Sequence, residues 1–238
     1  KNYLFNSGNL DVPFKDIKTV YVDEVQDRIY VGAHAGGMMV LHRKSGYIEY
    51  YNRHNSNLPS NNIYSIISDG YGGLWVASLE YLLHFDIDKR NFTIVDVDED
   101  GHKLQQYNRL LFCDSKKRIW AGGEMGISVF NQVGTSLLPN TDFQIASVLK
   151  QAFVNCFYET SSGYLWIGTR NGLFALKESD KQFLQYTTEN GLPSNVIYGI
   201  LEDAYGRLWI STNQGLSCLN PESGKFRNFT IMDGLQGN

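Results

Sequence analysis

The chain has 238 residues, of which 42% are apolar and 13% aromatic, while only 19% are charged. Together with 23 glycines this balance excludes a disordered chain, and it favours short aromatic strands joined by tight turns over long charged helices. The net charge of -4, with Lys and Arg scattered along the chain, excludes the basic surface of a nucleic-acid-binding protein.

Residues 1–14 hold one predicted strand. Residues 2–6, followed by Gly8 and Leu10, resemble residues 226–230, which are followed by Gly234 and Leu235. We therefore interpret residues 1–14 as the outer strand of a preceding repeat unit, whose other strands are absent from this chain.

From residue 15 onward one unit recurs five times, at intervals of about 45 residues. Each unit has an aromatic residue followed by small and β-branched residues, at Tyr30, Trp75, Trp120, Trp166 and Trp209. Six residues further on stand Gly36, Tyr81, Gly126, Gly172 and Gly215. Four of the five units thus have a glycine where a turn is expected.

Each unit contains four short strands separated by turn residues. In the last unit the predicted strands are residues 196–202, 208–212, 216–219 and 225–231. Nothing in this unit has the period of a helix, and four antiparallel strands recurring near 45 residues are typical of a β-propeller blade. A sandwich would not repeat its motif so regularly.

The predicted fold is an all-β propeller of five four-stranded blades. We assign the blades to residues 15–61, 62–107, 108–152, 153–195 and 196–238. Because the fifth blade has its own outer strand, the strand in residues 2–6 has no place in a five-blade ring. A seven-blade ring would need about 315 residues. We therefore expect a fragment of a larger, seven-bladed array, whose uncovered end faces would cause self-association.

The recurrent aromatic residue could form a sugar-stacking surface, but we predict that it packs between successive blades. The four tryptophans are therefore expected to be buried. Cys113, Cys156 and Cys218 each lie in an apolar run and are expected in the core, and their odd number argues against a disulfide framework.

The last two units resemble the two-component regulator propeller repeat, in residues 160–173 (TSSGYLWIGTRNGL) and 202–216 (EDAYGRLWISTNQGL), with NGLPSN at 190–195 between them. The resemblance implies a periplasmic sensor region of an inner-membrane hybrid histidine kinase that detects carbohydrate breakdown products. Its propellers would be followed by a sandwich domain, which would be a neighbour of this segment. The segment has no catalytic-histidine box and no ATP-binding glycine motif, so no enzyme activity and no cofactor are expected of it.

One acidic segment has the spacing of a calcium loop. Asp96, Asp98 and Asp100 precede Gly101 as in the first half of such a loop, but position twelve is Tyr107 instead of a bidentate Glu. We therefore predict a metal-free acidic loop and keep calcium as the minor alternative. The five histidines, His34, His42, His54, His84 and His102, have no metal-ligand spacing.

The turns between the second and third strands of each unit vary while the flanking strands keep their pattern, as expected of ligand-contacting loops on a constant scaffold. The candidate ligand-binding residues are His34, Glu124, Arg170, Asn171, Asn213 and Gln214. The sequence therefore predicts a sensor segment that recognises an oligosaccharide and makes no direct contact with nucleic acid or membrane. The alternatives are a protein-interaction scaffold and, below it, a propeller lyase, whose His and Glu arrangement is not recognisable.

Overall fold

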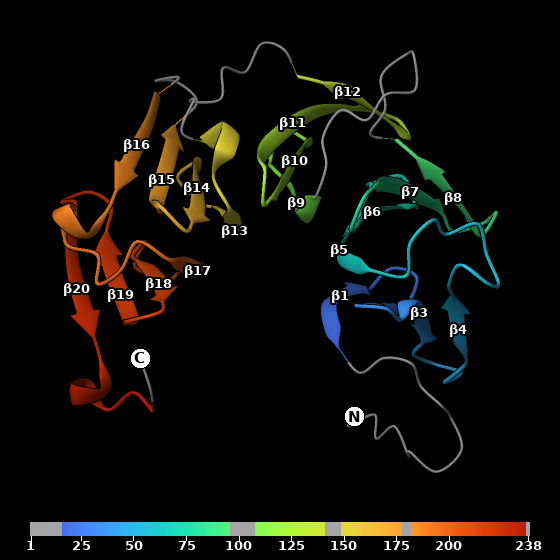
Figure 1. Ribbon diagram of the computed structural model, residues 1–238, viewed down its shortest axis with the longest axis horizontal. Helices are drawn as coiled ribbons and strands as arrows, with labels where there is room; N and C mark the ends of the chain where they lie inside the picture. The colour runs from blue at the N-terminus through green and yellow to red at the C-terminus, as the bar shows by residue number, and fades with distance from the viewer. Residues whose placement is uncertain (1–15, 96–107, 141–148, 178–181, 237–238) are drawn as a thin grey trace. The chain divides into compact units, whose positions relative to one another are not determined.

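The computed structural model describes residues 16–95, 108–140, 149–177 and 182–236 (Figure 1). Its strands form five four-stranded sheets, each built from consecutive strands. Within the described residues the helical elements are three single turns of 3-10 helix: η1 (Leu149–Gln151), η2 (Thr188–Asn190) and η3 (Ile231–Asp233). The predicted all-β fold of four-stranded propeller blades is confirmed.

The strands of each blade follow one another in chain order. Blade 1 has β1 (Ile17–Asp23), β2 (Arg28–Ala33), β3 (Gly37–His42) and β4 (Ile48–Tyr51). Blade 2 has β5 (Ile63–Ser68), β6 (Leu74–Ser78), β7 (Leu82–Asp86) and β8 (Asn91–Ile94). Blade 3 has β9 (Asn108–Cys113), β10 (Arg118–Gly123), β11 (Gly126–Val133) and β12 (Ser136–Pro139). Blade 4 has β13 (Val154–Glu159), β14 (Tyr164–Thr169), β15 (Gly172–Lys177) and β16 (Gln182–Tyr186). Blade 5 has β17 (Ile197–Glu202), β18 (Leu208–Thr212), β19 (Gly215–Asn220) and β20 (Lys225–Phe229).

The chain divides into two compact units, which are described separately. The first comprises residues 1–111 with 134–136, and the second comprises residues 112–133 with 137–238. The first unit therefore contains blades 1 and 2, and the second contains blades 4 and 5 and most of blade 3.

The recurrent aromatic residue has the same place in every blade, on the second strand and opposite the middle of the third. The register pairs Tyr30 with Val40, Trp75 with His84, Trp120 with Val129, Trp166 with Ala175 and Trp209 with Cys218. Trp75, Trp120 and Trp166 are at most 2% exposed, which confirms their predicted burial. Trp209 is less buried than these three, since its side chain is half-buried and stacks on Phe229 of its own blade, with ring centroids 5.4 Å apart.

Apolar side chains of neighbouring blades form shared cores within each unit. In the first unit Tyr30 and Val40 of blade 1 belong to one cluster with Ile63 and Ile66 of blade 2. In the second unit Trp166 of blade 4 packs with a set of blade 5 residues, Ile197, Ile200, Leu208 and Ile210. The aromatic residue thus fills the space between two sheets, as large side chains do in close-packed interiors.

Polar contacts also join adjacent blades in the second unit. The Glu159 carboxylate, at the end of β13, accepts hydrogen bonds of 2.7 Å from both the backbone N–H and the hydroxyl of Ser115 in blade 3. One blade further on, Glu202 at the end of β17 accepts from the N–H of Ser161 at 2.9 Å and from its hydroxyl at 3.1 Å. The same serine–glutamate contact therefore recurs at two successive junctions.

The turn between the second and third strands has one more residue in blade 1 than the sequence repeat suggests. The residue equivalent to Gly172 (φ 120°) and Gly215 (φ 99°) is Gly37 (φ 81°), and not Gly36. A Cβ on Gly37 would overlap the carbonyl oxygen of Tyr51. Glycine is required here because the backbone is left-handed and the end of the fourth strand lies against it.

The three cysteines are free thiols. Cys218 is buried as predicted. Cys156 is half-buried and packs against the apolar cluster shared by blades 4 and 5, whereas Cys113 is half-buried outside that cluster. Burial raises the pKa of the Cys113 thiol and raises that of Cys156 to about 12. Neither is therefore a reactive thiolate at neutral pH.

Candidate ligand-binding clefts between blades

An aspartate after the first strand ties the turn to the aromatic second strand. In blade 3, Asp114 Oδ1 accepts from the backbone N–H groups of Lys116 and Arg118, and its Oδ2 accepts from Arg118 Nε at 2.6 Å. The same Oδ2 accepts from Trp120 Nε1 at 2.8 Å. One carboxylate thus satisfies the turn and the buried indole together.

Blade 5 repeats this arrangement. Asp203 Oδ2 accepts from Arg207 Nε at 2.7 Å and from Trp209 Nε1 at 3.0 Å, while Oδ1 accepts from the backbone of Tyr205 and Arg207. Desolvation raises the pKa of Asp203, but the hydrogen bonds from Trp209, Arg207 and Tyr205 outweigh it and lower the pKa to about 2. The carboxylate is therefore ionised at neutral pH.

Blade 4 has Thr160 at the position of this aspartate. Its Oγ1 accepts from the N–H of Tyr164 at 3.1 Å and donates to the carbonyl oxygen of Tyr164 at 3.2 Å, so the turn keeps its shape. The short side chain does not bind the indole, and Trp166 Nε1 is buried without a hydrogen-bond partner among the residues that the structure describes. Such a donor costs about 1–3 kcal/mol.

A cavity of about 360 Å³ lies between blades 4 and 5, beside this unsatisfied indole. Thr160, Tyr164, Trp166 and Tyr186 line it from blade 4. The wall from blade 5 is formed chiefly by Glu202, Tyr205, Arg207 and Glu222. The volume falls within the range of about 300–1,000 Å³ that small-molecule sites occupy.

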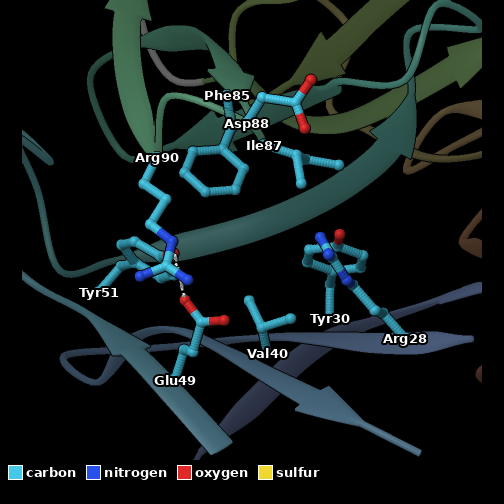
Figure 2. Close-up of a pocket in the computed structure, with 9 residues that line it drawn as sticks. All are labelled: Arg28, Tyr30, Val40, Glu49, Tyr51, Phe85, Ile87, Asp88 and Arg90. Carbon is cyan, nitrogen blue, oxygen red and sulfur yellow. Dashed lines mark hydrogen bonds and ion pairs between the residues drawn. The ribbon is translucent and has the colours of Figure 1, made fainter. Parts of the chain in front are cut away.

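A second cavity, of about 220 Å³, lies between blades 1 and 2 (Figure 2). Its position in the repeat is the same, because Tyr30, Val40 and Glu49 are paired across blade 1 as Trp166, Ala175 and Leu184 are across blade 4. Asp88 and Arg90 line it from blade 2. Its volume is below the usual range for ligand sites.

The polar contacts at this smaller cavity converge on Glu49. Figure 2 shows Arg90 reaching from blade 2 toward Glu49, to which its Nε lies at 3.5 Å. The Tyr51 hydroxyl donates to Glu49 at 2.7 Å, and His42 Nε2 lies 2.7 Å from the other carboxylate oxygen. Burial raises the pKa of Glu49, but these hydrogen bonds and the Arg90 charge lower it overall. A more open hollow of about 410 Å³ along β4 shares Glu49, Tyr51 and Arg90.

The candidate residues predicted from the sequence do not line these cavities. Arg170 and Asn171 follow the last residue of β14, whereas Tyr164, which lines the larger cavity, is the first residue of that strand. The Arg170 guanidinium lies 3.7 Å from the ring centroid of Phe153, and the Asn171 carbonyl accepts from Gln185.

The other four candidates lie on the corresponding turns of three blades. His34 Nδ1 is 3.9 Å from Asp16, and the backbone N–H of Gln214 donates to Thr212. Glu124 is half-buried and Asn213 is exposed. A role in ligand binding for these turns stays a prediction. One sign of the cavity between blades 4 and 5 is visible in the sequence: Thr160 stands where blades 2, 3 and 5 have an aspartate.

In the part of the chain that the structure describes, no three His, Cys, Asp or Glu side chains are grouped as a metal ion would require. Asp96, Asp98 and Asp100, the minor calcium candidates, lie outside the described residues. Likewise, the described residues include no helix of the length and apolar character needed to span a bilayer.

Comparison with known families finds the two-component regulator propeller repeat at residues 57–80, 149–171 and 191–214. These segments lie in and beside blades 2, 4 and 5. None of the curated proteins compared with the sequence matches it.

Solved structures share the fold at low sequence identity. The extracellular domain of a putative hybrid two-component system from B. thetaiotaomicron is 20% identical, with a TM-score of 0.69, over 90% of this chain and 28% of that one. A second such domain from the same organism is 16% identical, with a TM-score of 0.70, over 90% of this chain and 31% of that one. PorZ of Porphyromonas gingivalis, a surface component of the type-IX secretion system, is 20% identical, with a TM-score of 0.66, over 84% and 31%. This chain thus spans less than a third of each of these proteins.

Proposed function

Because the chain carries two-component regulator propeller repeats, we propose that it is a ligand-sensing segment of a hybrid two-component receptor. The receptor would be a histidine kinase of the inner membrane, with this segment in the periplasm. The observation that carries the proposal is the match of three separate repeats, at residues 57–80, 149–171 and 191–214. The similarity to extracellular domains of such systems supports the fold assumed for it.

In this proposal the segment binds and does not catalyse. The phosphoryl-transfer chemistry would belong to another part of the receptor, and the blades would supply a rigid scaffold whose clefts accept the signal molecule. We propose a carbohydrate breakdown product as that molecule. The cleft between blades 4 and 5 supports a carbohydrate, because it combines aromatic rings with carboxylate and guanidinium groups.

Titration calorimetry of the protein with a panel of plant and host oligosaccharides tests the proposal. We expect at least one oligosaccharide to bind with a stoichiometry of one and a dissociation constant between about 1 μM and 1 mM. In cells, the same oligosaccharide should switch on transcription that depends on the full-length receptor. A panel without any binder, together with a receptor that no oligosaccharide activates, would refute the proposal in favour of an interaction scaffold.

A further inference from the structure

We propose that the cavity between blades 4 and 5, around Thr160 and Trp166, is a binding site for a neutral saccharide unit. The inference rests on the proposed sensing function and gives that function a location. The repeat itself does not require a site here, because blades 2, 3 and 5 have an aspartate at the position of Thr160, and in blades 3 and 5 that aspartate accepts from the indole.

The first argument is the unsatisfied indole. Trp120 and Trp209 both donate to an aspartate, at 2.8 Å and 3.0 Å. At the equivalent position Thr160 leaves Trp166 Nε1 without a partner within the described residues, and both side chains line the same cavity. An indole N–H is a donor only, so the group that completes it must have an acceptor oxygen. A sugar hydroxyl or ring oxygen supplies one once the side chains that cover this buried nitrogen move aside for the ligand.

The second argument is the aromatic lining. Tyr164, Trp166 and Tyr186 follow one another along the blade 4 wall, with ring centroids 6.2 Å and 5.8 Å apart. Tyr205 stands at the rim and is 84% exposed. The C–H faces of a pyranose ring are apolar and pack on such rings, while its hydroxyls need polar partners. Burial raises the pKa of Tyr186, so its hydroxyl stays protonated and can donate.

The third argument is the arrangement of charge. Glu202 and Glu222 line the cavity as acceptors, and the Arg207 charge is already paired with Asp203. This balance disfavours a uronic acid or a sulfated sugar and suits a neutral one. Ser161 holds Glu202 through two hydrogen bonds, so this acceptor is oriented in advance and keeps free lone pairs for sugar hydroxyls.

The equivalent cleft between blades 1 and 2 also has a buried polar group that no hydrogen bond from the described part of the chain satisfies, the Tyr30 hydroxyl, but the acceptor in this cleft is not free. There Glu49 is occupied by Tyr51, His42 and Arg90, and the cavity measures about 220 Å³ instead of about 360 Å³. The two clefts differ in the residues that neighbouring blades bring to the same positions. We therefore assign the site to the blade 4–5 cleft.

The test follows the four indole N–H signals of ¹⁵N-labelled protein during titration with xylobiose, cellobiose, mannobiose and galactobiose. Digalacturonic acid serves as the anionic comparison, and Trp166→Phe assigns the Trp166 signal. We expect at least one neutral disaccharide to shift that signal, and the acid to bind at least about tenfold more weakly.

Two variants and one matched control locate the binding. Thr160→Asp restores the carboxylate of the other blades, so it should raise the melting temperature and weaken binding by at least about tenfold. Tyr205→Ala removes an exposed ring at the rim, so it should weaken binding without lowering the melting temperature. Tyr71→Ala is the control, because Tyr71 has the same place in the turn of blade 2 and is 70% exposed. It should leave binding unchanged.

The outcomes separate the site from the function. If a disaccharide binds but Thr160→Asp and Tyr205→Ala bind it as tightly as the wild type, the site is wrong and the sensing function stands. If no disaccharide of the panel moves the Trp166 signal while longer oligosaccharides bind elsewhere, the site is again refuted. If no saccharide of any length binds, both the site and the carbohydrate part of the proposed function fail.

Discussion

Trp120 donates its indole N–H to Asp114 across 2.8 Å, and this bond joins the turn after β9 to the middle of β10. Asp114→Thr would copy into blade 3 the residue that blade 4 has at position 160. It removes the carboxylate oxygen that accepts from both Trp120 Nε1 and Arg118 Nε, in a place where the Asp114 side chain is 1% exposed. We expect a loss of about 2–3 kcal/mol of unfolding free energy, measured by urea denaturation. Asp203→Thr is the comparison and should cost less, because Trp209 is only half-buried. Equal losses at the two positions would show that burial does not set the cost.

The contribution of the recurrent tryptophan to the free energy of unfolding should increase with the burial of its side chain. Trp166→Ala removes a 2% exposed side chain from the core shared by blades 4 and 5, so we expect a loss of about 3–5 kcal/mol. Trp209→Ala removes a half-buried ring that stacks on Phe229 and should cost clearly less. Thermal and urea unfolding of both variants measure the difference, and a near-neutral Trp166→Ala would contradict its packing role.

Alanine variants of two glycines in blade 5 distinguish the free-energy cost of a steric overlap from the cost of a left-handed backbone. Gly215 and Gly224 both have positive φ, 99° and 65°. A Cβ on Gly215 would overlap the carbonyl oxygen of Phe229, whereas nothing lies within 4 Å of one on Gly224. We therefore expect Gly224→Ala to cost about 1 kcal/mol and Gly215→Ala to cost at least about twice as much. Equal melting temperatures for the two variants would contradict the close approach of strand β20.

The lowered pKa of Asp203 predicts that the protein loses stability at acidic pH. Its pKa is lowered from 3.8 to about 2 in the folded protein, since the hydrogen bonds outweigh desolvation. A depressed folded-state pKa stabilises the fold above the unfolded value, and this contribution is lost as the pH falls from about 4 through 2. The stability difference between wild type and Asp203→Asn should therefore be constant from pH 5 to 7 and shrink below pH 4. Urea midpoints across this range test it, and a difference that grows on acidification would reverse the sign.

The acidic segment from Asp96 to Asp100 lies outside the described residues, and its metal-free state stays a prediction. Three alternate carboxylates without a twelfth-position Glu give an incomplete calcium shell. We expect the melting temperature to be the same in millimolar CaCl₂ and in EGTA. A calcium-dependent rise that disappears in Asp98→Ala would overturn this prediction.

The fold was predictable because every blade must solve the same packing problem with the same few residue types. The spacing of Tyr30, Trp75 and their equivalents predicts the length of the repeat, and the turn residues between them predict four strands in each repeat. The turn of blade 1 was placed one residue early, because Gly36 and Gly37 are adjacent and only the backbone shows which one is left-handed.

The clefts were not predicted, because each depends on what two blades contribute to the same place. Glu49 and Leu184 occupy equivalent positions, yet the first joins a network with Arg90 and the second lines an open cavity. The variation of the turns predicts ligand contacts at Arg170 and Asn171, which lie at the other end of β14. The exchange of aspartate for Thr160 was visible in the sequence, but its meaning depends on the buried indole six residues later.

The hydrogen bonds between Ser161 and Glu202 join blades 4 and 5, and both residues also line the cavity between these blades. A molecule that bonds to Glu202 draws on the same carboxylate that latches the two sheets together. If ligand binding changes the equilibrium constant of the Ser161–Glu202 contact by some factor, then forming that contact changes the ligand affinity by the same factor. Ser115 and Glu159 make the corresponding contact at the junction one blade earlier. A ligand at this cavity would therefore strengthen or weaken the hydrogen bonds that join blades 4 and 5.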